Sequence, residues 1–170
     1  MRILVVVDMQ NDFVSGALGS KEAQAVLPLI NERISAAQDV VYTFDTHTEE
    51  YLSTQEGQNL PVIHCVKGTW GHALADGLMV KDGSKRIEKP TFGSLELGGY
   101  VKEVFERGEI DAVELVGVCT DVCVISNALL IKAHCPQLPV SVVASCCAGV
   151  TPESHANALK AMEACQVKII

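Results

Sequence analysis

Basic stretches are missing from this sequence, and basic side chains are in the minority. Its 13 lysines and arginines are outnumbered by 21 aspartates and glutamates, which gives a formal net charge of −8. Such a charge repels phosphate backbones and anionic lipid surfaces unless a local basic patch reverses the field, and the sequence contains no such patch. Nucleic acid and membrane are therefore not expected as partners.

Long apolar runs are also absent. The N-terminal stretch MRILVVVDMQ has only six apolar residues before Asp8. This is too short for the apolar part of a signal peptide or for a transmembrane helix, but it is long enough for one buried strand. These features predict an intracellular, cytoplasmic protein.

The cysteines lack a regular spacing, although there are seven of them. Small secreted domains that are held by disulfides usually have an even number of cysteines at regular spacings, and this sequence has neither feature. No C-x-x-C pair occurs, which argues against a thiol redox protein. Most of these cysteines are expected to be free thiols that fill the core.

No repeat, linker or low-complexity tract divides the 170 residues, and 48% of them are hydrophobic. A chain of this size buries roughly 70% of its unfolded surface when it folds. Residues 1–170 are therefore expected to form one domain with a core that needs no disulfide.

Four short runs rich in β-branched residues lack alternation of apolar and polar side chains, as expected of parallel strands covered on both faces. They are residues 3–7, 39–45, 112–118 and 139–145. Helical spacing occurs in 22–38, 98–109, 123–134 and 151–165, and 166–170 is expected to form a last strand. This order predicts an α/β fold with a three-layer, doubly wound, mostly parallel sheet and right-handed crossovers.

Reactive polar residues follow the ends of these runs. They are Asp8, Asp45, Lys89, Cys119 and Cys123. Taken singly, each has a structural explanation, as a turn-forming carboxylate, a solvated lysine or a packed thiol. Ligands of doubly wound sheets bind beyond the carboxyl ends of the strands, so these residues are expected to meet there. Together an Asp, a Lys and a Cys supply a proton acceptor, a cation that favours thiolate, and a nucleophile.

The two thiols in GVCTDVCVISNALL, at Cys119 and Cys123, lie where a strand pattern changes into a helix pattern. By themselves they fit half of a metal site, a disulfide, two packed core residues, or one nucleophile beside an inactive thiol. A helix start is also where the pKa of a thiol falls, which is compatible with a nucleophile.

The segment from His47 to Lys89 is longer than an ordinary connection and contains five glycines. Long irregular insertions at strand ends are usually functional. Asp45 and His47, two residues apart at a strand end, share a face, and carboxylate with imidazole suits a divalent ion. The alternative is that this DTH sequence only caps the next turn.

Five motifs occur in order along the chain: DMQNDF from Asp8, DTH from Asp45, HCVKGTWG from His64, EKPTFGS around Lys89, and GVCTDVCV from Gly117. Together they resemble the isochorismatase-like cysteine hydrolases, and within them the nicotinamidase branch. The resemblance covers nearly the whole chain and implies the isochorismatase-like hydrolase fold.

The resemblance implies a role for each residue of a Cys-Asp-Lys triad. Cys123 would be the nucleophile, Asp8 the general base and acid, and Lys89 the charge partner of both. Cys119 would contribute only its backbone, because the N–H groups of Cys119 and Cys123 would form an oxyanion hole after a cis Val118–Cys119 peptide bond.

The resemblance also implies one divalent metal ion, with Zn²⁺ expected and Mn²⁺ or Fe²⁺ as alternatives. Its ligands would be Asp45, His47, Glu56 and His64. Glu49 and Glu50 compete with Glu56 for the place of the second carboxylate.

The substrate implied is nicotinamide, which would be hydrolysed to nicotinate and ammonia through a thioester. Phe13 would form one wall of the ring pocket. Relatives commonly place an aromatic residue and two prolines before the second histidine, whereas this chain has Leu60-Pro61-Val62-Ile63, so Leu60 or Phe92 would form the other wall. A weak Michaelis constant is therefore expected. Another small-amide or carbamoyl/ureido hydrolase of the same superfamily is the alternative, and a homo-oligomer is expected in either case.

Other cysteines and histidines receive no catalytic role. Cys65 is expected to pack, and Cys135 and Cys165 are expected to fill the core. No role is predicted for three histidines, which are placed at the surface or at helix ends: His72, His134 and His155.

Overall fold

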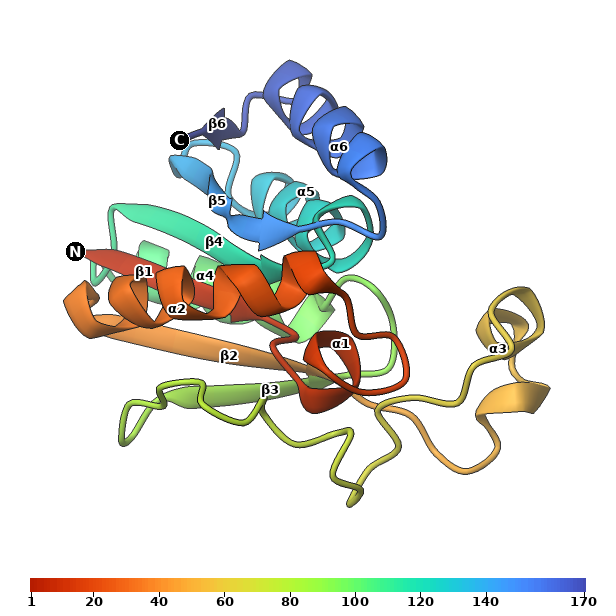
Figure 1. The fold of residues 1–170 in the computed structure, drawn as a ribbon. Helices are drawn as coiled ribbons and strands as arrows, with labels where there is room; N and C mark the ends of the chain where they lie inside the picture. The colour runs from red at the N-terminus through yellow and green to blue at the C-terminus, as the bar shows by residue number, and fades with distance from the viewer.

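Six parallel strands form one sheet in the computed structural model of the chain, which describes residues 1–170 (Figure 1). The strands are β1 (Arg2–Val7), β2 (Asp39–Asp45), β3 (Lys85–Lys89), β4 (Ala112–Val118), β5 (Val140–Ala148) and β6 (Lys168–Ile169). Their order across the sheet is β3-β2-β1-β4-β5-β6. The predicted α/β class with a parallel sheet is confirmed.

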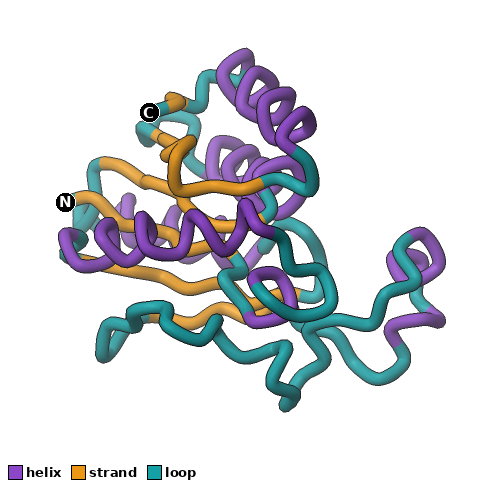
Figure 2. The backbone as a smooth tube through the Cα atoms, viewed as in Figure 1, coloured by secondary structure: helices purple, strands orange, loops and turns teal.

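Helices cover both faces of the sheet (Figures 1 and 2). The covering helices are α1 (Asn11–Val14), α2 (Lys21–Ala36), α4 (Leu95–Glu106), α5 (Ile125–His134) and α6 (Pro152–Ala164), whereas α3 (Gln55–Asn59) lies away from the sheet. Two shorter elements are the 3-10 turn η1 (Tyr51–Ser53) and the π-helical turn η2 (Thr120–Val124). None of the helices combines the length and the apolar character that crossing a membrane requires.

Two apolar cores lie on opposite faces of the sheet. In β1, Ile3, Val5 and Val7 pack into the core beneath α4, α5 and α6. Leu4 and Val6 pack into the other core, beneath α1 and α2. Because both faces of the strand are buried, its sequence shows an unbroken apolar run instead of an alternating one.

The direction in which the chain adds strands reverses between β1 and β4. From β1 the chain builds outward through β2 to β3, and it then returns to the centre to build β4, β5 and β6. Such a reversal opens a crevice at the carboxyl ends of the two central strands. The residues that follow β1 and β4 are therefore placed side by side.

Gly117 allows β4 to approach β1 closely near this crevice. Its φ is 120°, and a Cβ atom there would lie 2.1 Å from the carbonyl oxygen of Val7. The register between β4 and β5 also shifts between Leu115 and Gly117. A side chain at this position would push the two central strands apart.

Several boundaries differ from those that the sequence predicts. Helix α4 begins at Leu95, ahead of the glycine pair, because Ser94 Oγ accepts a hydrogen bond from the N–H of Leu97. Helix α6 begins after Thr151, as predicted, with a capping box that Ser154 completes. The expectation for Cys165 is wrong: this residue is exposed, because the helix ends at Ala164 and the chain turns outward before β6.

Residues 46–66 project from the body of the molecule as an arm that carries η1 and α3 (Figure 2). Its two ends are joined in a parallel bridge between His47 and Val66. Across this bridge the N–H of His47 donates to Cys65 O at 3.0 Å, and the N–H of Lys67 donates to His47 O at 2.9 Å. The arm therefore leaves and re-enters the sheet edge at one place, beside the end of β2.

Candidate active site

Asp8 follows β1, and its carboxylate is completely buried. Its φ of 49° is a left-handed conformation that is uncommon outside glycine and is concentrated at functional sites. The N–H of Asp8 donates to Thr43 Oγ1 at 3.2 Å, and the Thr43 hydroxyl donates to Asp8 Oδ1 at 2.6 Å. One carboxylate oxygen is thus fixed by β2.

Lys89 ends β3 and brings its ammonium to the same place. Its Nζ lies 2.6 Å from Asp8 Oδ2, 3.4 Å from Asp45 Oδ1 and 3.5 Å from Cys123 Sγ. It also donates to the carbonyl of Thr91 at 3.1 Å. Burial alone would lower the pKa of this ammonium, but its acidic neighbours hold it above its ordinary value, so Lys89 stays charged.

Cys123 lies in the turn η2 and is buried. Burial first, and then the nearby Asp8 carboxylate, raise the pKa of its thiol well above the ordinary value. Burial also raises the pKa of Asp8, although Lys89 opposes this. The thiol is therefore protonated at rest, and it has beside it a carboxylate that is more basic than usual.

The second carboxylate oxygen of Asp8 pairs with Lys89. Oδ2 lies 2.6 Å from Lys89 Nζ in a buried ion pair, and it has no other hydrogen-bond partner. A carboxylate oxygen that pairs with one cation keeps a lone pair that can accept a proton. Oδ2 is therefore the candidate proton acceptor of the site.

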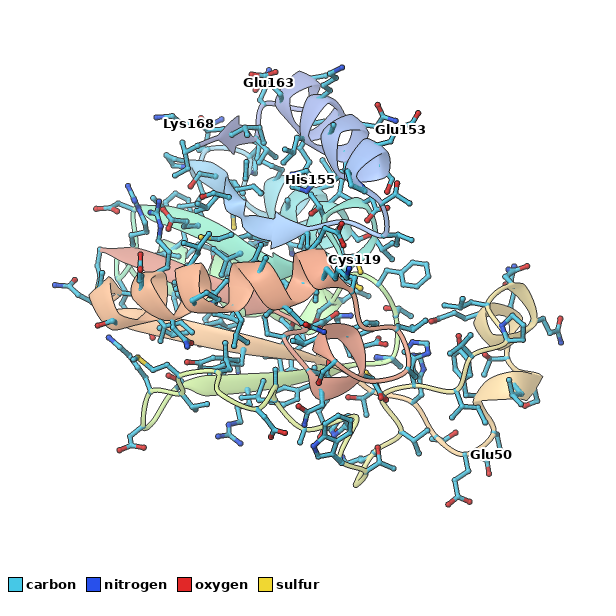
Figure 3. The ribbon with its side chains drawn as sticks, viewed as in Figure 1. Glu50, Cys119, Glu153, His155, Glu163 and Lys168 are labelled. Atoms are coloured by element: carbon cyan, nitrogen blue, oxygen red, sulfur yellow. The ribbon has the colours of Figure 1, made fainter.

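The Val118–Cys119 peptide bond is cis, as predicted. The N–H of Cys119 donates to no acceptor in the protein, whereas its carbonyl accepts from the N–H groups of Val122 and Val124. The Cys119 thiol is partly exposed at the mouth of the crevice (Figure 3). Cys119 thus offers an unused backbone donor at the start of the turn that carries Cys123.

A second cluster brings together the four predicted metal ligands. Asp45 Oδ2 lies 2.9 Å from His47 Nε2 and 3.3 Å from His64 Nε2. Glu56 Oε1 lies 3.5 Å from His47 Nε2 and 3.8 Å from His64 Nε2. One ligand atom from each residue falls within 4.8 Å of all the others. Two imidazoles and two carboxylates at these separations suit a borderline divalent ion.

Hydrogen bonds around the cluster orient its ligand atoms. The carbonyl of Val62 lies 2.7 Å from His64 Nδ1 and can only accept, so Nδ1 carries a proton and Nε2 is the ring nitrogen that faces the cluster. Burial alone would raise the pKa of Asp45, but its histidine neighbours and Lys89 hold it well below its ordinary value. Asp45 is therefore an anionic ligand. The residues present fit a divalent ion.

Glu56 alone of the three competing glutamates reaches this cluster. It lies on α3 and is partly buried, and its Oε1 lies 3.5 Å from His47 Nε2. Glu49 and Glu50 are exposed, and Figure 3 shows Glu50 pointing away from the molecule. The predicted alternatives at these two positions do not join the ligand set.

Tyr51 packs against both imidazoles. The sequence alone predicts no role for this residue. Its fully buried ring lies 4.6 Å from the His47 ring and 4.9 Å from the His64 ring, centre to centre. Its hydroxyl donates to the carbonyl of Leu60 at 2.9 Å. Phe13 meets the His64 ring edge-on at 5.5 Å. The His64 ring thus contacts both Tyr51 and Phe13, and the His47 ring contacts Tyr51.

A cavity of about 230 Å³ joins the thiol to the four-ligand cluster. Its wall includes Cys119 and Cys123 together with three of the four clustered ligands. The three predicted substrate-binding residues also line it: Phe13, which is buried, and Leu60 and Phe92, which are 39% and 46% exposed. The cavity is mainly apolar, with polar groups at two places, as in pockets for small flat molecules.

Three further buried polar residues shape the site, and sequence reasoning did not assign them. Thr43 fixes Asp8. Gln10 donates to the Asp45 carbonyl and accepts from the Asp45 N–H. Asn127 on α5 donates to the Cys123 carbonyl at 2.8 Å. Only Thr43 had a signal in the sequence, as a polar residue between Tyr42 and Phe44 in a buried strand.

Comparison with known proteins gives consistent matches. A model of the isochorismatase domain family matches residues 2–170. The nicotinamidase of Saccharomyces cerevisiae is 31% identical over 175 aligned residues, covering 76% of this chain and 80% of the relative. The nicotinamidase/pyrazinamidase of Mycobacterium tuberculosis is 29% identical and covers 100% of this chain and 98% of the relative. The solved pyrazinamidase of Pyrococcus horikoshii in complex with zinc has a TM-score of 0.85 at 29% identity, covering 99% and 98% of the two chains.

Proposed function

Because the chain belongs to the isochorismatase domain family, we propose that it is a metal-containing cysteine amidohydrolase of the nicotinamidase type. It converts nicotinamide and water to nicotinate and ammonia. Relatives that carry the name nicotinamidase support the assignment. The single observation that carries it is the apolar cavity with the Cys123 thiol at one place in its wall and the four-ligand cluster at another.

The first half-reaction forms a thioester. Asp8 Oδ2 takes the proton of the Cys123 thiol, and the sulfur attacks the carbonyl carbon of the amide. The carbonyl π bond becomes an oxyanion, which accepts hydrogen bonds from the N–H groups of Cys119 and Cys123. When the carbonyl re-forms, the C–N bond breaks, and protonated Asp8 delivers its proton to the departing ammonia.

The second half-reaction hydrolyses the thioester with the same groups. Asp8, again a carboxylate, accepts a proton from water while the oxygen attacks the thioester carbonyl. The oxyanion forms in the same place, the C–S bond breaks, and the proton on Asp8 returns to the sulfur as nicotinate leaves. Lys89 stays charged throughout and balances the alternating charge of Asp8 and sulfur.

The metal site would be formed by Asp45, His47, Glu56 and His64, with Zn²⁺ as the expected ion. When bound, the ion supplies a Lewis acid for a ring nitrogen, and so contributes to the orientation of the substrate. The thiol already provides the nucleophile, and Asp8 provides the proton transfers. The ring of the substrate would lie between Phe13 and the side of the cavity formed by Leu60 and Phe92.

Ammonia release from a panel of small amides tests this function. The purified protein, loaded with Zn²⁺, is expected to release ammonia from nicotinamide and pyrazinamide faster than from benzamide, which has the ring but no ring nitrogen. If the protein hydrolyses none of these three aromatic amides but cleaves an aliphatic amide or a ureido compound, it is the alternative hydrolase of this superfamily. A protein that releases ammonia from none of these would contradict the proposal.

A further inference from the structure

His155 on α6 contacts the turn that carries the nucleophile, although it lies outside the cavity. Its Nδ1 is 2.7 Å from the hydroxyl oxygen of Thr120. Thr120 is fully buried and directly follows Cys119, whose free N–H is the first donor of the oxyanion hole. Figure 3 shows His155 on the inner side of α6, whereas Glu153 and Glu163 of the same helix point outward.

A second contact ties the same two segments together. Asp121 Oδ1 accepts a hydrogen bond from the N–H of Val150 at 3.0 Å. Gly149 lies against α6 so closely that a Cβ atom there would be 2.9 Å from the Cα of His155. Gly149 and Val150 line the cavity. The start of α6 is therefore packed against both the pocket wall and the turn.

The Thr120 hydroxyl has no side-chain partner other than His155. Burial lowers the pKa of His155, although Asp121 opposes this, so the imidazole is neutral near pH 7. A neutral ring can share one hydrogen with the hydroxyl at Nδ1 whichever group donates it. This contact fixes the first residue of η2 from outside the cavity, while Asn127 holds the Cys123 carbonyl from α5.

We propose that His155 is a positioning residue for the oxyanion hole: its bond to Thr120 holds residues 119–123 so that the two N–H groups meet the oxyanion. The inference rests on the proposed function. Oxyanion donors stabilise the transition state only when they are held in place beforehand, and a displacement of about 1 Å can cost about 100-fold in rate. The substrate in its ground state gains little from this placement, so binding is not expected to depend on it.

Two pairs of variants separate the hydrogen bond from the packing. His155→Leu and His155→Asn have side chains of similar shape, but only the amide of Asn places a polar atom near the position of Nδ1. Thr120→Val removes the hydroxyl with little change in volume, and Thr120→Ser retains it. Glu153→Gln, on the exposed side of the same helix, is the control.

The readouts are kcat and KM for nicotinamide and the inhibition constant of pyridine-3-carboxaldehyde. Asp8 takes the proton of the Cys123 thiol, the sulfur forms a C–S bond with the aldehyde carbon, and the C=O π bond becomes an oxyanion, so the affinity of the aldehyde reports on the oxyanion hole without turnover. His155→Leu and Thr120→Val are each expected to lower kcat about 10- to 100-fold and to change KM by no more than about twofold. Each should raise the inhibition constant of the aldehyde by a factor similar to the loss of kcat.

Rescue and non-additivity complete the test. His155→Asn and Thr120→Ser are expected to recover most of kcat, and the Thr120→Val/His155→Leu double variant to be no slower than the slower single one. Three results would overturn the inference. Thr120→Val could keep the wild-type kcat, a slow variant could keep the wild-type inhibition constant for the aldehyde, or the loss of kcat in the double variant could equal the product of the two single losses. The kcat and inhibition constant of each variant are compared with those of an active wild type. A wild type that releases no ammonia from any amide would instead contradict the proposed function.

Discussion

At the scale of single residues, Asp8 has a different neighbour on each carboxylate oxygen. Oδ1 accepts a hydrogen bond from the Thr43 hydroxyl, whereas Oδ2 forms an ion pair with the Lys89 ammonium and has no other partner. The first contact fixes the carboxylate, and the second leaves a lone pair on Oδ2 for a proton. In the proposed reaction Asp8 therefore serves both half-reactions.

Replacing this carboxylate is expected to affect both half-reactions at once. Asp8→Asn removes the proton acceptor, so kcat for nicotinamide should fall by at least about 1,000-fold. Members of one catalytic unit are not additive, and the Asp8→Asn/Cys123→Ala double variant should be little slower than either single variant. Steady-state kinetics of the three variants checks this, and a double variant slowed by the product of the two losses would contradict it.

Leu60 is the place where a stacking ring is expected to improve binding. An aromatic pair contributes about 0.5–1.5 kcal/mol beyond burial of area, so Leu60→Phe should lower KM for nicotinamide severalfold to about tenfold with little change in kcat. Leu52→Phe, another exposed arm leucine that lies outside the cavity, is the matched control. Equal KM values for the two variants would contradict the assignment of Leu60 to the wall of the ring pocket.

At the scale of elements, the arm is the segment that completes the ligand cluster. His47 and His64 lie close to its two ends, Glu56 lies on α3, and Tyr51 packs against both imidazoles. The bridge between His47 and Val66 closes the arm at the sheet edge. Ligands far apart in sequence are thereby brought to Asp45 at the end of β2.

Metal content should follow this ligand set. The purified protein is expected to hold about one equivalent of Zn²⁺, Mn²⁺ or Fe²⁺. His64→Ala should lose it, Glu56→Ala should retain it less tightly under a chelator, and Glu50→Ala should match wild type. Elemental analysis gives the result directly. Unchanged metal content after removal of both His47 and His64 would contradict the site.

The elements were predictable to different degrees. The buried strand β1 could be predicted from its unbroken apolar run after Arg2, because both of its faces are covered, and β4 could be predicted although Glu114 interrupts its run. Helix α3 was not predicted, since its five residues stay helical through the Thr54 cap and tertiary contacts more than through an apolar pattern. The predicted helix over 123–134 includes only the last two residues of η2, because the sequence alone does not distinguish a π-helical turn from an α-helical one.

At the scale of the whole molecule, the reversal between β1 and β4 places Asp8 beside Cys123. Candidate residues at strand ends could be predicted because parallel strands present their carboxyl ends at one edge. Supporting residues such as Thr43, Gln10 and His155 could not, because each acts through a partner that only the folded chain brings near.

Replacing two different glycines with alanine should change the free energy of unfolding in opposite directions. Gly117→Ala introduces a Cβ at φ 120° and 2.1 Å from the Val7 carbonyl, and it should lower the free energy of unfolding by about 3 kcal/mol or more. Gly99, in α4, has open space at its Cβ position, so Gly99→Ala should raise that free energy by up to about 1 kcal/mol. Urea denaturation measures both. A Gly117→Ala variant as stable as wild type would contradict the close approach of β4 to β1.

In the proposed reaction only one of the two thiols in the cavity, that of Cys123, forms the thioester. Ammonia release from nicotinamide, measured for metal-loaded wild type, Cys119→Ala and Cys123→Ala, tests this assignment most directly. Because Cys119 would contribute only its backbone, Cys119→Ala should remain within a few-fold of wild type, whereas Cys123→Ala should retain its fold and metal but release no ammonia above background. Turnover by Cys123→Ala at the wild-type rate would contradict the account.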